Sequence, residues 1–266
     1  MRSLAFNVAY YVLSVTHVLA AVTASLVGGR AATRRVVAAY VARMVWAMRV
    51  FAGIRVEARG RERLPPGAFI IAAKHQSWGD GFCMYSQFED VAIVTGDHLE
   101  KLPLFRGILR NLGAIVVDSC GGPEARHALS EHAAQAHADG RKILIYPEGH
   151  LAAVGTRFRY RTGVYHMARD FGMPVVPVAT NLGLYWPEMD WAKHPGTAVV
   201  EFLDPIEAGD DKAAFMAALE MAVETRTAEL VAEATGEPVR RSVLKRPASE
   251  PLSSAVTEPV AVAGEG

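Results

Sequence analysis

A histidine and an aspartate stand five residues apart where an apolar run ends. The run is 69–73, and His75 and Asp80 follow it within the segment 74–80. Residues five apart on a helix point about 140° away from each other, so a helix could not present both side chains to one point. A strand-to-helix turn could, and the aspartate would then fix the imidazole tautomer and leave the other ring nitrogen to accept a proton. The spacing is therefore typical of a general base with an orienting carboxylate.

The same residues also fit a purely structural role. Ser77 followed three residues later by Asp80 is a helix-start pattern, in which the carboxylate closes a capping box with the serine. His75 would then be an ordinary loop histidine. Short patterns recur by accident, so the choice between catalysis and capping depends on the rest of the chain.

Three further motifs follow at the ends of later apolar runs. They are Gly113-Ala114-Ile115-Val116-Val117-Asp118, Tyr146-Pro147-Glu148-Gly149 and Pro174-Val175-Val176-Pro177-Val178. Ligand sites of α/β sheets collect at the carboxyl ends of strands, which favours a shared site. Taken alone, Tyr146-Pro147-Glu148-Gly149 is also typical of an ordinary turn at the end of a strand, because proline and glycine are common in loops.

Together the four motifs resemble those of the glycerolipid acyltransferase family, which includes the 1-acyl-glycerol-3-phosphate acyltransferases. In that family the motifs run H-x4-D, G-x-I-x-x-D-R, F-P-E-G-T-R and V/I-P-V/I-x-P-V, in this order and at about this spacing. The resemblance covers roughly residues 54–206, and the N-terminal membrane pair is also similar to bacterial members. Four ordered motifs are far more specific than one.

The resemblance implies a membrane-bound O-acyltransferase of phospholipid biosynthesis. Such an enzyme moves a fatty acyl chain from acyl-CoA or acyl carrier protein (acyl-ACP) to the free hydroxyl of 1-acyl-sn-glycerol-3-phosphate and gives phosphatidic acid. His75 would be the general base, Asp80 would hold and charge its imidazole, and Glu148 with Gly149 would shape the acceptor pocket. Transfer would be direct, because the only hydroxyl beside His75 belongs to Ser77, which we assign to capping. No cofactor is expected apart from the thioester donor.

The chain departs from the family where the acceptor phosphate is held. It has His150-Leu151 in place of T-R and Asp118-Ser119 in place of D-R. Losing a forked guanidinium removes bidentate phosphate binding. The possible substitutes are other arginines, namely Arg126, Arg157, Arg159 and Arg161. A solvated or membrane-facing basic loop explains the last three about as well.

These departures keep two alternatives open. The acceptor could be another lysolipid, such as a lyso-ornithine lipid, or the protein could be an inactive lipid-binding homologue. The intact pair of His75 and Asp80 argues against the second alternative, and the altered third motif argues for it.

Strands that alternate with helices from residue 54 onward must position these motifs. The pattern indicates an α/β fold with a mixed, mostly parallel sheet flanked by helices, in a domain over 53–236. Strands are expected at 54–58, 69–73, 91–95, 114–117, 142–146, 175–179 and 197–202, and helices at 78–87, 104–111, 123–138, 164–171 and 212–234. The composition of 237–266 predicts a disordered tail.

Residues 1–52 predict two helices that anchor the protein in a membrane. The segment 3–29 has no charged residue and as a helix would reach about 40 Å, long enough to span a bilayer. Its scattered polar residues leave an interfacial position open, and a buried helix or a signal peptide are alternatives. The second helix, 31–52, has one apolar and one arginine-bearing side, which suits an anionic membrane surface or a plain surface helix. The arginine excess predicts a domain on the cytoplasmic face of the inner membrane.

Net charge, cysteine spacing and the absence of other motifs argue against other classes of function. The formal net charge is zero, so nothing indicates a nucleic-acid partner, and Cys83 with Cys120 form no C-x-x-C motif, which suggests a reducing compartment or buried thiols. No G-x-S-x-G, nucleotide phosphate loop or G-x-G-x-x-G is present. His127, His132 and His137 recur every fifth residue, which scatters them around a helix, so we expect no metal site.

Overall fold

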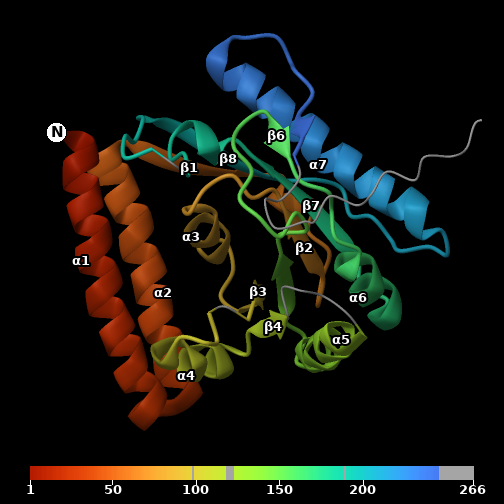
Figure 1. The fold of residues 1–266 in the computed structure, drawn as a ribbon, viewed down its shortest axis with the longest axis horizontal. Coiled ribbons are helices and arrows are strands. Elements are labelled where there is room, and N and C mark those ends of the chain that lie inside the picture. The colour runs from red at the N-terminus through yellow and green to blue at the C-terminus, as the bar shows by residue number, and fades with distance from the viewer. Residues whose placement is uncertain (98, 118–122, 189, 246–266) are drawn as a thin grey trace, which may run out of the picture.

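The N-terminal part of the chain is a helical hairpin along one side of the molecule (Figure 1). The computed structural model describes residues 1–97, 99–117, 123–188 and 190–245, apart from the side chains of Pro103 and residues 123–129. Helix α1 (Arg2–Thr23) continues into a π-helical turn (Ala24–Gly28), and α2 (Gly29–Ala47) returns beside α1. Gly29 has φ +64°, a conformation that other residues rarely adopt, so glycine permits the reversal here.

The two faces of the hairpin differ in their surroundings. Phe6, Met44 and Met48 are fully buried against the domain. The opposite face of α1 carries large exposed apolar side chains, which are Leu4, Val8, Tyr11, Val12, Val15 and Leu19. Within the described residues, the helical segment Arg2–Ala52 is the one long and apolar enough to cross a membrane, with a mean hydropathy of 1.7 in its most apolar stretch. The structure therefore contains the predicted N-terminal pair of helices.

A seven-stranded sheet forms the centre of the domain, in the order β1-β8-β7-β2-β5-β3-β4. Every neighbouring pair is parallel except β7 and β8, which are antiparallel. The strands are β1 (Ile54–Arg59), β2 (Ile70–Ala73), β3 (Val91–Gly96), β4 (Ile115–Val117), β5 (Lys142–Ile145), β7 (Val175–Thr180) and β8 (Gly196–Phe202). The predicted fold class, a mixed and mostly parallel sheet with flanking helices, is confirmed.

Helices cover both faces of the sheet, and the alternation of β2 connects the two layers. Ile71 and Ala73 pack into the cluster formed with the hairpin, whereas Ile70 and Ala72 pack into the cluster on the other face. All four residues are buried, as a central strand requires. The helices of the domain are α3 (Asp80–Tyr85), α4 (Pro103–Leu112), α5 (Pro123–Ala138), α6 (Gly163–Phe171) and α7 (Lys212–Thr235).

The chain after α7 differs from the prediction. A disordered tail from residue 237 is wrong for residues 242–245, because β9 (Val243–Leu244) pairs with β6 (Thr156–Arg157) in a small parallel ladder. The amide of Val243 donates to the carbonyl of Gly155 at 2.9 Å, and Ser242 contacts Arg157. Two-residue strands leave no periodic pattern, so the sequence does not indicate β6 or β9. Residues 246–266 lie outside the described residues.

Candidate active site

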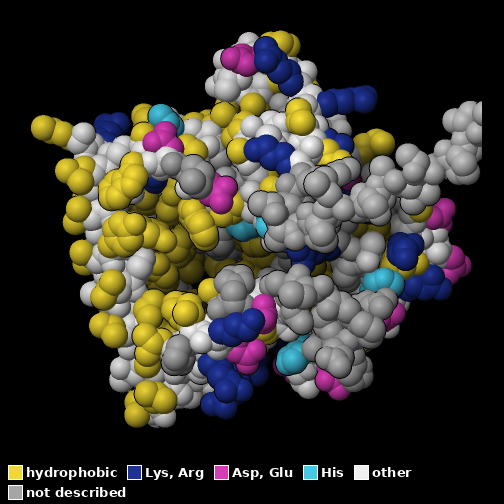
Figure 2. Space-filling view, in the orientation of Figure 1, with side chains coloured by type: hydrophobic (Ala, Val, Ile, Leu, Met, Phe, Trp, Pro, Cys, Tyr) yellow, Lys and Arg dark blue, Asp and Glu magenta, His cyan; other side chains and the backbone are white. Residues whose placement is uncertain are grey.

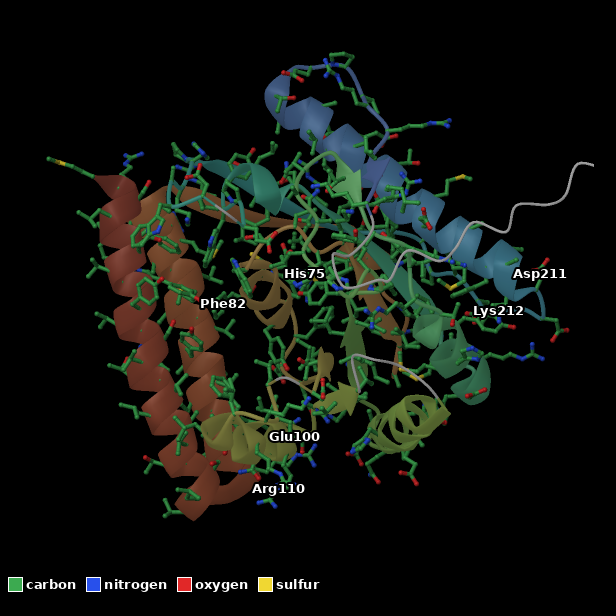
Figure 3. All side chains as sticks on the ribbon, in the orientation of Figure 1. His75, Phe82, Glu100, Arg110, Asp211 and Lys212 are labelled. Carbon is green, nitrogen blue, oxygen red and sulfur yellow. The ribbon has the colours of Figure 1, made fainter. Side chains whose placement is uncertain are left out.

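The central strand ends in a turn that brings His75 and Asp80 together. Strand β2 ends at Ala73 and α3 begins at Asp80, so His75 lies in the connection, near the centre of the molecule (Figure 3). The Nδ1 atom of His75 is 3.0 Å from Oδ2 of Asp80. The same oxygen accepts the backbone N–H groups of Gln76 at 2.7 Å and Ser77 at 2.8 Å. The carboxylate therefore orders the turn and holds the imidazole at once.

These contacts decide the tautomer of the histidine. An ionised carboxylate only accepts hydrogen bonds, so the proton of neutral His75 lies on Nδ1 and the lone pair on Nε2. No partner for Nε2 is found in the described part of the chain, and the side chain is 23% exposed. Nε2 can accept a proton from a bound hydroxyl. Asp80 thus both orients His75 and accepts the amide of Ser77, as expected of the carboxylate in a capping box. Ser77 itself does not cap the helix, because its hydroxyl accepts from the amide of Gly79 at 3.0 Å, inside the turn.

The neighbouring strand supplies further contacts to His75. Strand β5 is parallel to β2 with Ala72 opposite Ile145, so the residues after both strands meet at the same edge of the sheet. The ring of Tyr146 stacks on the imidazole with centroids 4.1 Å and planes 19° apart. The backbone of His75 is held on both sides, since its amide faces Glu148 at 3.4 Å and its carbonyl accepts from the amide of Ala152 at 2.7 Å.

Glu148 belongs to a buried charged cluster beneath the turn. Its Oε2 accepts from Nζ of Lys74 at 3.0 Å and from the amide of Phe158 at 2.9 Å. Lys74 also donates to Oε1 of Glu224 at 2.8 Å, and the hydroxyl of Tyr160 donates to the same oxygen at 3.0 Å. Burial raises the pKa of Glu148, and the charge of Lys74 opposes that rise. The carboxylate thus connects β2 to the loop after β5 and is fully covered.

The predicted phosphate-binding arginines separate into two groups. Arg157 is directed at α7: its Nε is 2.8 Å from Oε1 of Glu220, and its guanidinium donates to the carbonyl of Ser242. This placement speaks against a role at the acceptor. Arg159 is exposed, and the amide of Arg161 donates to the carbonyl of Pro147 at 2.8 Å.

Gly149 allows Arg161 to approach the turn after β5 closely. A Cβ at Gly149 would lie 2.8 Å from Nε of Arg161, and the residue has φ +67°. Both facts favour glycine at this position. Arg161 therefore lies over the turn that carries Glu148. Asp118 and Ser119 lie outside the described residues, as does the side chain of Arg126.

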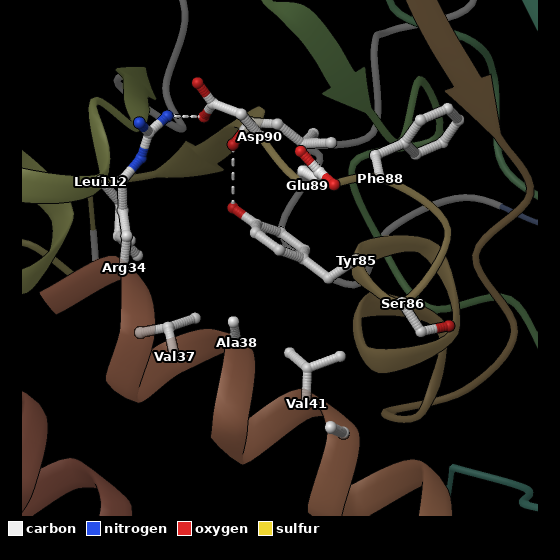
Figure 4. A pocket seen from close by; sticks show the side chains of 12 residues that line it. Arg34, Val37, Ala38, Val41, Tyr85, Ser86, Phe88, Glu89, Asp90 and Leu112 are labelled. Atoms are coloured by element: carbon white, nitrogen blue, oxygen red, sulfur yellow. Dashed lines mark hydrogen bonds and ion pairs between the residues drawn. The ribbon is translucent and has the colours of Figure 1, made fainter. Parts of the chain in front are cut away.

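The surroundings of the turn are hollowed and largely apolar. Figure 2 shows a central hollow walled by hydrophobic side chains on the side of the hairpin. Two separate cavities of about 250 Å³ are not lined by His75. One lies between α2 and the end of α3, where Arg34 pairs with Asp90 and the hydroxyl of Tyr85 donates to the carbonyl of Val91 (Figure 4). The other lies beside α7 and is lined by Lys74 and Gln76.

Sequence reasoning missed the partners of Lys74. A lysine directly after a buried strand is a signal, because buried ammonium groups need carboxylate partners. The sequence did not indicate which carboxylate, since Glu224 lies 150 residues away on α7. As to the expected absence of a metal, no group of three or more His, Cys, Asp or Glu residues is placed to bind one within the described ranges.

Comparisons with known proteins show which family and which fold this chain is similar to. The acyltransferase family model matches residues 55–181. A 1-acyl-sn-glycerol-3-phosphate acyltransferase of Pseudomonas aeruginosa is 34% identical over 204 residues, which cover 77% of this chain and 79% of the relative. The enzyme of that name from Saccharomyces cerevisiae is 26% identical over 137 residues, 50% of this chain and 45% of that protein. Among solved structures, the 1-acyl-sn-glycerophosphate acyltransferase PlsC of Thermotoga maritima superposes with a TM-score of 0.68 at 21% identity, covering 86% of this chain and 98% of that one.

Proposed function

The chain belongs to the acyltransferase family, and from that premise we propose that it acylates the free hydroxyl of 1-acyl-sn-glycerol-3-phosphate to give phosphatidic acid. The acyl donor is a thioester, either acyl-CoA or acyl-ACP. The observation that carries the proposal is the hydrogen bond of 3.0 Å between His75 and Asp80, which leaves Nε2 as a base at the edge of the sheet. The relatives named for this reaction support the choice of acceptor.

In the proposed reaction His75 moves one proton. Nε2 takes the proton of the acceptor hydroxyl as the oxygen attacks the thioester carbonyl, because an alcohol is too weak a nucleophile unaided. The tetrahedral intermediate then collapses, the carbon–sulfur bond breaks, and the imidazolium gives its proton to the leaving thiolate, which departs as the thiol. Asp80 stabilises the imidazolium between these steps. No covalent acyl-enzyme is required, since Ser77 is bonded within the turn.

We place the acceptor phosphate at Arg159 and Arg161. Both follow the turn of Glu148 and Gly149, which is bonded to the backbone of His75. The arginine missing at Leu151 is thereby replaced from eight and ten residues further on. Guanidinium groups suit this task because their forked donors match phosphate oxygens. Arg157 is left out, since Glu220 and Ser242 hold it.

We propose that residues 1–52 anchor the catalytic domain, 53–236, to the cytoplasmic face of the inner membrane. The exposed apolar face of α1 supports burial in lipid. Both α1 and the π-helical turn that follows it contact the domain: the side-chain amide of Asn7 donates to the carbonyl of Trp191, and Ser25, in the turn, lies against Gly107. These contacts favour a hairpin embedded beside the domain over a helix that crosses the bilayer alone. Arginines of the first 60 residues suit the anionic leaflet.

An acceptor panel tests the proposal. The full chain in detergent would be supplied with one acyl-CoA or acyl-ACP and with lysophosphatidate, a lyso-ornithine lipid or monoacylglycerol. We expect transfer to lysophosphatidate at the highest kcat/KM. Faster transfer to the lyso-ornithine lipid would overturn the acceptor, and no transfer to any of them would favour an inactive lipid-binding homologue.

A further inference from the structure

The aromatic ring stacked on His75 has no part in the proton transfer described above. Tyr146 directly follows β5, at the position where the family motif has phenylalanine, and its ring lies flat against the imidazole with centroids 4.1 Å apart. We propose that Tyr146 is a positioning residue, whose ring fixes the plane of His75 so that Nε2 stays directed at the acceptor hydroxyl. The inference rests on the proposed function of His75 as the base.

The other contacts of His75 leave its imidazole ring free to tilt, and the stacked ring of Tyr146 removes this freedom. The hydrogen bond to Asp80 fixes the position of Nδ1, and the contacts of Glu148 and Ala152 fix the backbone. A bond to one ring atom still permits the ring to tilt, because hydrogen-bond directions are broadly distributed. A flat ring against the face of the imidazole opposes the tilt. A displacement of about 1 Å at a reacting group can cost about 100-fold in rate.

The stack also acts on the charge that forms during transfer. Once His75 holds the proton, its cation lies over the electron-rich face of the Tyr146 ring, an attractive arrangement. The neutral imidazole of the resting enzyme gains less from it. An interaction that strengthens along the reaction raises kcat and leaves substrate binding almost unchanged.

The hydroxyl of Tyr146 is not needed for this role. It is buried and has no hydrogen-bond partner among the residues that the structure describes. Burial raises the pKa of Tyr146, so the side chain stays neutral, and the ring packs at the edge of the core cluster that contains Cys83 and Leu144. The positioning role therefore belongs to the ring, and phenylalanine should serve equally well.

Steady-state kinetics with two variants separate the ring from the hydroxyl. We expect Tyr146→Phe to keep kcat within about threefold, and Tyr146→Met, which fills similar space without a ring, to lose about 10- to 100-fold in kcat with KM changed less than about threefold. The matched control is Tyr165→Met, a buried tyrosine in the cluster on the other face of the sheet. It should lose thermal stability without losing kcat. Equal kcat in the Phe and Met variants would overturn the proposal.

A spectroscopic measurement keeps the test independent of the acceptor. In protein labelled at its histidines, with the His75 signals identified by their absence in His75→Ala, the ring current of Tyr146 should shift the imidazole protons upfield. The shift should persist in Tyr146→Phe and disappear in Tyr146→Met. If it is absent from the parent, the stack is wrong. If it is present while no acceptor is acylated, the proposed function fails and the stacking stands.

Discussion

The turn between β2 and α3, where we place the base, and the loop that follows β5 form two halves of the proposed site with different construction. In the turn, one carboxylate oxygen of Asp80 holds three consecutive residues, all within five positions of it in the chain. In the loop, the contacts reach far away: Arg157 bonds to Ser242, 85 residues on. The half to which we assign the proton transfer is thus built locally, whereas the half to which we assign the choice of acceptor depends on α7 and on the chain beyond it.

Removing the base should produce the largest effect on the locally built half. We expect His75→Ala to lose at least about 10²- to 10⁴-fold in kcat, the usual contribution of a positioned base, while the thermal midpoint and vesicle binding stay at parental values. Transfer of a labelled acyl chain measures kcat, calorimetry measures the thermal midpoint, and sedimentation with vesicles measures membrane binding. His194→Ala, at an exposed histidine, is the control. A parental rate in His75→Ala would remove the base assignment.

The cluster under the turn should show the largest effect on stability. Lys74→Met leaves Glu148 and Glu224 buried without their cation, so we expect a loss of about 3–5 kcal/mol in the free energy of unfolding. Denaturant titration measures it. Lys212→Met, at the exposed start of α7, should change stability by less than about 0.5 kcal/mol.

A double variant refines this test. Adding Glu224→Gln to Lys74→Met removes one of the two unpaired carboxylates, so part of the lost stability should return. If the two changes are simply additive, the link between Lys74, directly after β2, and Glu224 on α7 is weaker than its distance of 2.8 Å implies.

The acceptor half should respond in binding and hardly in turnover. We expect Arg161→Ala and Arg159→Ala each to raise KM for lysophosphatidate about tenfold, the value of one charge-assisted hydrogen bond at a partly solvated site, with kcat near the parental value. With monoacylglycerol, which lacks the phosphate, neither change should matter. Arg157→Ala should lower stability and spare KM, because its partners are Glu220 and Ser242. A tenfold rise in KM confined to Arg157→Ala would reverse our assignment.

The difference between the halves also explains what sequence could predict. The turn was predictable because a buried four-residue strand, a histidine and an aspartate at fixed spacing leave few geometries, and the parallel pairing of β2 with β5 then brings Tyr146 and Glu148 alongside. The predicted start of α3 was two residues early, since Ser77 bonds inside the turn and not at a helix end. The sequence does not predict the partners of Arg157, because no local pattern links Glu220 and Ser242 to it.

The smallest effect we predict decides to which half Glu148 belongs. Burial raises its pKa above the ordinary 4.5 despite Lys74. Below pH 4.5 the group is protonated in both the folded and the unfolded chain, and its contribution to stability is fully present. As the pH rises through the raised pKa, the unfolded chain releases the proton more readily than the folded one, so that contribution is lost.

The free energy of unfolding of the parent should therefore fall with rising pH relative to Glu148→Gln, which has no such proton. Denaturant titrations of both proteins from below pH 4.5 upward isolate the contribution of Glu148 to stability, since the other carboxylates contribute equally to each protein. If the free energy of unfolding of the parent instead rises with pH relative to Glu148→Gln, the ion pair with Lys74 outweighs burial. Glu148 would then stay charged, as expected of a group that contacts the acceptor. A relative fall places it with the buried support of the turn, where its bonds to Lys74 and the amide of Phe158 already put it.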